Sequence, residues 1–258
     1  MNAVSGTEPL YEICVDSVAG VLAAEQAGAH RVELCSDLFE GGITPSIGLV
    51  ETALRAAERI RVHVIVRPRG GDFVYDEHEV DAMERDVVAI REAGAHGLVI
   101  GALTPDGDID HDVVGRLMNA AELRSVTFHR AFDMVRDPFA ALEELIDLGV
   151  DRVLTSGQDS SVLEGAPLIA QLVRQAAGRI VVMPGGGITA RNVARVLAAT
   201  GAAELHFAAG TTVESPAVHR NPYPYMGGAL RQPEFARQTT SARGVGDIIA
   251  AAGSGTRS

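Results

Sequence analysis

The stretch that decides the fold is Arg31-Val32-Glu33-Leu34-Cys35-Ser36-Asp37-Leu38-Phe39-Glu40-Gly41-Gly42-Ile43-Thr44-Pro45. Its first five residues alternate polar and apolar side chains, which is typical of a strand whose polar side chains share one face. The chain then breaks at two glycines and restarts at Thr44-Pro45-Ser46, a pattern that favours the start of a helix. The stretch therefore predicts one unit of a strand followed by a helix.

The same unit recurs along the chain. Eight runs of strand length lead into polar or glycine-containing segments, and they cover residues 10–15, 31–35, 61–67, 96–100, 125–129, 152–155, 179–183 and 203–207. Four of these strands are entered through a similar helix end, with the glycines Gly28, Gly94, Gly149 and Gly201 about two units apart. Eight units without a dinucleotide-binding motif predict an α/β fold, a single (β/α)8 TIM-type barrel over about residues 10–207. We expect the rest of this single domain, about residues 208–258, to be an irregular segment with a final helix.

Composition and charge exclude several classes of function. Hydrophobic residues make up 47% of the chain but aromatic residues only 4%, so the core must consist of small aliphatic side chains, which suits parallel strands covered by helices. The formal net charge of −12 disfavours nucleic-acid and membrane-surface partners. No apolar run approaches the roughly 20 residues needed to cross a bilayer, and the first residues show no signal peptide. We therefore expect a cytoplasmic protein.

Polar residues gather where the working face of such a barrel would lie, at the carboxyl ends of the strands. Those with the parity that points inward are Glu12, Cys14, Glu33, Cys35, His63, Arg67, Thr127, His129, Glu204 and His206. Buried carboxylates cost several kcal/mol unless they are paired, and Arg31, Arg67 and Arg130 are available partners. Two interpretations stay open, a structural network of ion pairs inside the barrel and a ligand site.

The two cysteines of the chain occupy equivalent positions on neighbouring predicted strands, in Glu12-Ile13-Cys14 and Glu33-Leu34-Cys35. Because adjacent strands lie about 4.8 Å apart, two aligned thiols could share one ion or form a bond. Soft sulfur ligands suit Cu(I) better than a hard cation, although two ligands do not complete a tetrahedral zinc site. A pair of buried, apolar-like cysteines is an equally good interpretation.

Other residues predict a site for a small anion. Arg67 and Arg69 resemble a clamp for a carboxylate or phosphate, with pairing to Glu12 and Glu33 as the alternative, and the glycine run after the seventh strand would let backbone N–H groups approach an anion. His129 is the best candidate for acid–base chemistry or ligation. The predicted ligand-binding residues are Arg67, Arg69, Arg130, Ser156, Gly185, Gly186, Gly187 and His206. No nucleotide cofactor is evident.

Together, these motifs resemble one known family. The matching segments are Leu10-Tyr11-Glu12-Ile13-Cys14, Arg31-Val32-Glu33-Leu34-Cys35, residues 40–46, Val66-Arg67-Pro68-Arg69-Gly70-Gly71, Thr127-Phe128-His129-Arg130-Ala131-Phe132-Asp133, residues 154–157 and residues 183–187. Over about residues 10–210, the chain resembles the copper homeostasis protein CutC family. The resemblance implies a cytoplasmic, self-associating TIM-type barrel that binds copper, and it assigns the copper to Cys14 and Cys35. One departure is that the family's serine after the final strand is missing here.

Two functions are consistent with these observations. The first is a copper homeostasis protein that binds Cu(I) through Cys14 and Cys35, with His129 as a weaker third ligand, and that forms a homodimer or higher homo-oligomer. The second is an enzyme that acts on a small anionic or phosphorylated metabolite, with Glu12, Glu33, His129 and Asp133 as its acid–base residues. Whether the protein is an enzyme stays open.

Overall fold

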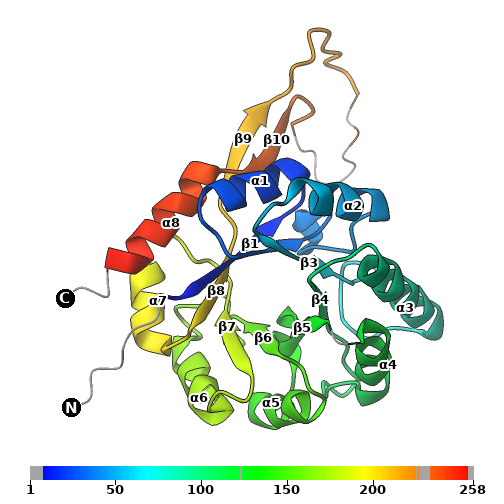
Figure 1. Ribbon diagram of the computed structural model, residues 1–258, viewed down its shortest axis with the longest axis vertical. Coiled ribbons are helices and arrows are strands. Elements are labelled where there is room, and N and C mark those ends of the chain that lie inside the picture. Colours follow the sequence, from blue (N-terminus) through cyan, green and yellow to red (C-terminus); the bar gives the residue numbers. More distant parts are fainter. Residues whose placement is uncertain (1–7, 123, 225, 227–232, 255–258) are drawn as a thin grey trace.

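A barrel of eight parallel strands forms the centre of the computed structural model, which describes residues 8–122, 124–224, 226 and 233–254. The strands are β1 (Leu10–Val15), β2 (Arg31–Leu34), β3 (Arg61–Ile65), β4 (Gly97–Ile100), β5 (Ser125–Phe128), β6 (Arg152–Thr155), β7 (Val181–Pro184) and β8 (Glu204–Phe207). Their order is β7-β6-β5-β4-β3-β2-β1-β8, and a bridge between Gly185 and His206 joins the two ends into a ring (Figure 1). The predicted TIM-type barrel is confirmed.

Helices surround this ring, one after almost every strand (Figure 1). They are α1 (Val18–Gln26), α2 (Ile47–Ala56), α3 (Glu77–Glu92), α4 (His111–Ala121), α5 (Pro138–Asp147), α6 (Ala166–Ala176), α7 (Val193–Thr200) and α8 (Ala242–Ser254), with short 3-10 turns η1 (Leu38–Glu40) and η2 (Arg130–Met134). Several helices begin where a side chain accepts hydrogen bonds from the first turn, as the sequence suggests. Ser17 caps α1, Ser46 caps α2, and Asp76 forms a capping box with Glu79 on α3.

The hydrophobic core lies between the strands and the helices. On β1, the buried side chains of Tyr11, Ile13 and Val15 belong to the main apolar cluster, together with Val21 of α1. The alternate residues of the same strand point the other way, into the barrel. The apolar core is therefore outside the ring, and the inside of the ring is left for polar side chains.

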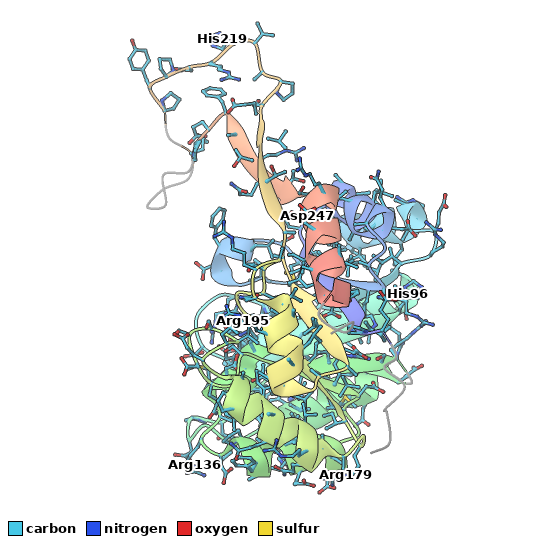
Figure 2. The ribbon with its side chains drawn as sticks, turned by 90° about the vertical axis from the view of Figure 1, so that its left-hand side faces the viewer. His96, Arg136, Arg179, Arg195, His219 and Asp247 are labelled. Carbon is cyan, nitrogen blue, oxygen red and sulfur yellow. The ribbon has the colours of Figure 1, made fainter. Side chains whose placement is uncertain are left out.

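The connection from β8 to α8 carries an arm that the sequence did not predict. Within the segment expected to be irregular, β9 (Gly210–Glu214) and β10 (Ala236–Thr240) pair as an antiparallel ribbon. The arm projects away from the barrel, with His219 at its far end (Figures 1 and 2). At its base, the Ser241 N–H donates to the Ala209 carbonyl at 2.7 Å, and α8 then packs between α7 and α1.

Part of the segment expected to be irregular, residues 225, 227–232 and 255–258, lies outside the described residues. Among the helices that the structure describes, none is long and apolar enough to cross a membrane.

Candidate functional site

The inside of the barrel holds many polar side chains, beside a small apolar cluster of Cys35, Ile65 and Val99. Glu12, Glu33, His63, His129 and Glu204 are all buried there, as the alternation along the strands predicts. The interpretation as a structural network holds at the end where the strands begin, where ion pairs line a cavity. The interpretation as a ligand site stays a prediction for the cavity at the end where the strands finish.

At the end where the strands begin, four side chains form a closed ion network, here called the lower network. Arg31 donates to Glu12 and, at 2.6 Å, to Glu204, and Arg152 donates to Glu204 at 3.0 Å. Two positive and two negative groups therefore balance. Burial alone would raise the pKa of Glu12, but the charge of Arg31 and a hydrogen bond from His206 hold it well below its usual range.

The arginines differ from expectation in part. Arg31 does pair with the inward carboxylates, but Arg67 and Arg130, which were the other expected partners, do not. Arg67 donates to backbone carbonyls, and Arg130 donates to Asp133 at 2.7 Å and to Ser156 at 2.8 Å. Arg152 takes the second place in the lower network. One feature of the sequence could have indicated that Arg152 points into the barrel, because it has the same parity along the strand as Leu154 and Ser156.

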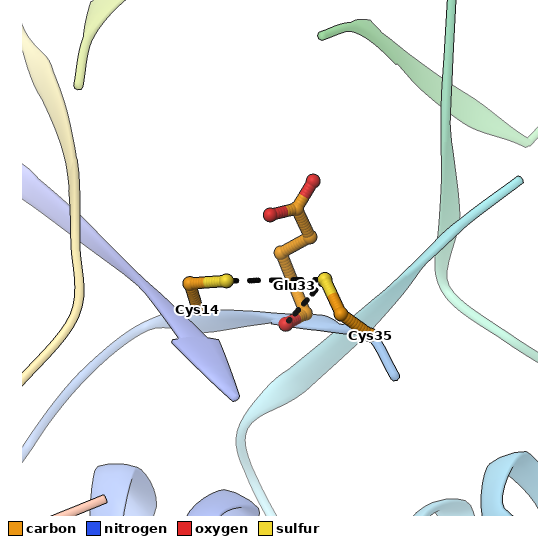
Figure 3. A group of neighbouring side chains, drawn as sticks. All are labelled: Cys14, Glu33 and Cys35. Carbon is orange, nitrogen blue, oxygen red and sulfur yellow. Dashed lines mark hydrogen bonds between the residues drawn. The ribbon is translucent and has the colours of Figure 1, made fainter. Parts of the chain in front are cut away.

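At the opposite end, a cavity of about 680 Å³ forms the barrel mouth, and two of the predicted metal ligands lie close together beside it. The Sγ atoms of Cys14 and Cys35 are 3.8 Å apart, and they face each other in Figure 3. With Glu33, they form the group of three described side chains that could hold a metal ion, with ligand atoms within 4.8 Å of one another. Cys14 lines the cavity and is partly exposed, whereas Cys35 is buried.

The thiols meet for a reason other than the one predicted. The expected alignment of Cys14 with Cys35 is wrong, because the strands are staggered and the register places Cys14 opposite Glu33. Cys35 lies one residue beyond the end of β2, where its N–H still donates to the Val15 carbonyl at 2.8 Å. Stagger of this kind is required to close a barrel. The two side chains span the offset, and their sulfur atoms come into contact.

The surroundings favour one thiolate in this pair. The hydrogen bond from the Cys35 thiol lowers the pKa of Cys14 to about 5, and His206 assists while burial opposes. The same contact, with burial, raises the pKa of Cys35 well above its usual value. Burial and the charge of Cys14 raise the pKa of Glu33 to about 8. The pair can therefore offer a soft anionic sulfur ligand near neutral pH.

His206 supports that charge distribution. Its Nδ1 lies 2.8 Å from Glu12 Oε1, and its Nε2 lies 3.7 Å from Glu33 Oε2. Burial would lower the pKa of His206, but hydrogen bonds to Cys14 and Glu12 and the two carboxylates raise it well above the usual value. A protonated imidazole beside Cys14 stabilises the thiolate.

The residues predicted for the anion site are only partly brought together. Arg67, Arg130, Gly186, Gly187 and His206 line the cavity. The cavity lining does not include Arg69, which pairs with Glu79 of α3 at 2.5 Å. The expected clamp of two arginines is therefore not formed.

Asp133 lines the cavity, but its carboxylate is occupied by hydrogen bonds to the adjoining loop. Its carboxylate accepts hydrogen bonds from the Thr155 hydroxyl at 2.5 Å, from the Ser156 N–H at 3.0 Å and from the Gln158 N–H at 3.2 Å, in addition to Arg130. Ser156 is itself held between Arg130 and Asp133. These bonds fix the segment after β6 against η2. In the structure, the Asp133 carboxylate therefore holds the backbone of this loop in place.

The glycines after β7 allow a close approach of backbone to side chains. A Cβ on Gly185 would lie 2.6 Å from Leu154 Cδ1, and Gly186 has a φ of +113°. The Gly187 carbonyl accepts from Asn192, and α7 begins only after that residue. The run is thus needed for a tight turn over β6, and its role toward an anion stays a prediction.

Two glycines, Gly97 on β4 and Gly101 directly after it, were missed, and they make room for two buried imidazoles. A Cβ on Gly97 would lie 2.5 Å from the His63 ring, and one on Gly101 would lie 2.4 Å from the His129 ring. β4 was the strand whose end contributed no motif to the resemblance. A strand with glycine at its inward positions, next to strands with inward histidines, was the signal that could have revealed the fit.

Comparison with known proteins gives consistent matches over most of the chain. The model of the CutC family matches residues 9–211. The copper homeostasis protein cutC homolog of Homo sapiens is 52% identical over 231 residues, which are 90% of this chain and 84% of that protein. A CutC family protein of Mesorhizobium japonicum is 52% identical over 244 residues, 95% and 94% of the two chains. A solved structure of CutC from Streptococcus agalactiae superposes with a TM-score of 0.75 at 35% identity, covering 77% of this chain and 98% of that one.

Proposed function

Because the chain belongs to the CutC family, we propose that it is a copper homeostasis protein that binds Cu(I) through Cys14 and Cys35. The observation that carries the proposal is the 3.8 Å separation of the two sulfur atoms at the barrel mouth. One thiol lines the cavity and provides a route for the ion, while the other is buried and fixed by the strand.

The separation of the thiols fits two bonds to one soft ion. Metal–sulfur bonds of about 2.3 Å at a tetrahedral angle place their sulfur atoms about 3.8 Å apart. Thiolates select Cu(I) over hard cations. Because the pKa of Cys14 is lowered to about 5, this side chain is already a thiolate near neutral pH and releases no proton when the ion binds. A bent arrangement of this kind leaves room for a third ligand.

Glu33 and His206 are the candidates for that third ligand. Glu33 belongs to the same group of ligand atoms, and His206 forms a hydrogen bond with Cys14. The group that the structure describes includes neither His129, which the sequence suggested as third ligand, nor His206, whose raised pKa keeps its ring protonated. We therefore propose Glu33 as the third ligand, with His206 as the group that stabilises the Cys14 thiolate.

A titration of the purified protein with Cu(I), with a competing chelator that reports free metal, tests the proposal. We expect one ion per chain in the wild type and no competitive binding in the Cys14→Ser, Cys35→Ser double variant. Met183→Leu is the matched control, because it removes a buried sulfur that accepts from Arg31 of the lower network at 3.3 Å and does not belong to the group of candidate ligand atoms. Unchanged binding by the double variant would rule the site out.

The alternative function is an enzyme for a small anionic metabolite. The contacts of its expected acid–base residues leave fewer of them available for proton transfer. Glu12 is bonded to Arg31 and His206, and Asp133 is bonded to loop backbone. Glu33 and His129 are left for proton transfer. We give this function second place, and its anion-binding component is taken up below.

We also propose that the protein acts in the cytoplasm and associates with itself. The family membership supports both proposals, and the projecting arm offers exposed apolar side chains, Val213, Val218 and Tyr223, for contacts with a second copy. Sedimentation velocity of the purified chain would measure the assembly state, and a monomer at all concentrations would overturn the second proposal.

A further inference from the structure

Arg67 is a buried cation without a counter-ion among the described side chains. It is 6% exposed, and its Nη atoms donate to neutral backbone carbonyls, including Gly42 at 3.0 Å and Gly71 at 2.9 Å. Its Nε–H meets no described acceptor within hydrogen-bond geometry, and the Tyr75 hydroxyl beside the guanidinium is unpaired as well. A buried charge without an opposite charge is costly, and so is an unsatisfied buried donor. An anion at this guanidinium would remove both costs.

His129 presents a second donor that lacks a partner. It is 4% exposed, and its Nδ1 accepts from the Ala131 N–H at 3.2 Å, which places the ring proton on Nε2. No described group accepts from Nε2. Burial and the charge of Arg67 lower the pKa of His129 to about 3, so the ring is neutral and Nε2–H is a fixed donor near neutral pH.

The two donors lie beside the same aromatic ring and line the same mouth cavity. The Phe73 ring lies 5.0 Å from the His129 ring and 5.1 Å from Arg67 Cζ, measured to ring centroids. Both donors line the cavity of about 680 Å³, a volume typical of sites for small organic molecules. Leu154 and Phe207 line the same space. An inorganic ion would leave this apolar wall uncovered, whereas an organic anion would cover it.

We propose that the barrel mouth binds a small organic carboxylate, whose oxygens accept from Arg67 Nε–H and His129 Nε2–H. Its carbon skeleton lies against Phe73, Leu154 and Phe207. This site uses neither sulfur atom, so it goes beyond copper binding and does not depend on it. The ligand class follows from the unpaired Arg67 guanidinium, the neutral His129 donor and an apolar wall, since Arg130 and His206 are already paired with carboxylates.

Binding of simple probes to the wild-type protein tests the ligand class. The probes are benzoate, acetate, benzyl alcohol and inorganic phosphate. We expect benzoate to raise the melting temperature and to shift the ¹⁵N resonance of His129 Nε2, and acetate to do so more weakly because it covers less apolar surface. Benzyl alcohol, which lacks the charge, should bind least. Failure of both carboxylates at millimolar concentrations, or tighter binding of phosphate than of benzoate, would overturn the proposal.

Variants test the two donors. Arg67→Met and His129→Phe should each weaken benzoate binding at least about tenfold, the loss expected for a hydrogen bond to a charged group. His63→Phe is the matched control, because His63 is also buried with an unpartnered nitrogen but lines the opposite end of the barrel. The melting temperature without ligand shows whether each variant folds, and Arg67→Lys replaces Arg67→Met if the latter does not.

The double cysteine variant separates this proposal from the copper proposal. Cys14→Ser, Cys35→Ser should lose Cu(I) and keep its affinity for benzoate. Equal benzoate affinity in Arg67→Met and wild type would overturn the carboxylate site, whatever the copper titration shows.

Discussion

At the end where the strands begin, Arg31 and Arg152 are matched by Glu12 and Glu204, whereas at the mouth Arg67 is held by neutral carbonyls. Both ends contain a cavity of similar size, about 700 Å³ at the lower network and about 680 Å³ at the mouth. Volume alone therefore does not distinguish them. The two ends differ in whether their charged and polar groups have partners. The arginines and carboxylates of the lower network are paired with one another, whereas the mouth keeps hydrogen-bond donors without a described partner and two thiols that form no disulfide.

Removing one charge from each end should give the largest contrast. Arg31→Met leaves two buried carboxylates short of a partner, and we expect it to lower the free energy of unfolding by about 3–5 kcal/mol. Arg67→Met leaves only carbonyls without a donor, and we expect a loss of about 1–3 kcal/mol. Urea denaturation of both variants at neutral pH measures the two losses. An equal or greater loss in Arg67→Met would contradict the contrast between the ends.

Filling the space on β4 should have a smaller effect at both ends. Gly97→Ala and Gly101→Ala each force a methyl group against an imidazole, and overpacking of this kind costs about 1–3 kcal/mol. Gly48→Ala in α2 is the control, because a Cβ there meets no atom within 4 Å and should be neutral or stabilising.

A second substitution sharpens this test. In the double variant Gly101→Ala, His129→Ala, the ring that the new methyl group meets is gone. The double variant should therefore lose less stability than the sum of the losses in the two single variants. Additive losses in the double variant would show that the glycine is needed for some other reason.

The pH dependence of stability should change in opposite directions in two mouth variants. Folded Glu33 keeps its proton up to about pH 8 instead of 4.5, so it contributes stability that falls as the pH rises through that window. Folded Cys14 loses its proton near pH 5 instead of 9, so its contribution rises with pH between those values. In the wild type the two contributions oppose each other.

Relative to the wild type, Glu33→Gln should therefore make the plot of unfolding free energy against pH rise more steeply, and Cys14→Ser should make it fall. Urea denaturation between pH 5 and pH 8 measures both slopes. A change in the same direction in both variants would contradict the opposite pKa shifts of Glu33 and Cys14.

Most of the fold was predictable because its signals are local. Alternation along strands such as β2, caps such as Ser17 and glycines such as Gly28 at helix ends act within a few residues, and they place the elements in order. The arm was not predictable, since β9 and β10 pair across more than twenty intervening residues that include several prolines.

The site was predictable by residue type and much less by partner. Inward parity brought Cys14, Cys35 and His129 into the barrel, but the stagger between strands decides which side chain meets which. The pairing of Arg152 with Glu204 joins β6 to β8, and no spacing in the sequence encodes it. Contacts across the ring depend on the closed geometry of all eight strands.

The hydrogen bond between Ser241 and Ala209 means that the chain leaves the barrel and returns to it at one point. The arm is thus an insertion into the last strand-to-helix connection, and the rest of that connection would close without it. Beyond β10, whose Thr240 lies against Gly20 of α1, changes of length or sequence in the arm need not disturb the barrel or the mouth. The protein is therefore modular, and its binding chemistry and the surface carried by its arm are free to evolve separately.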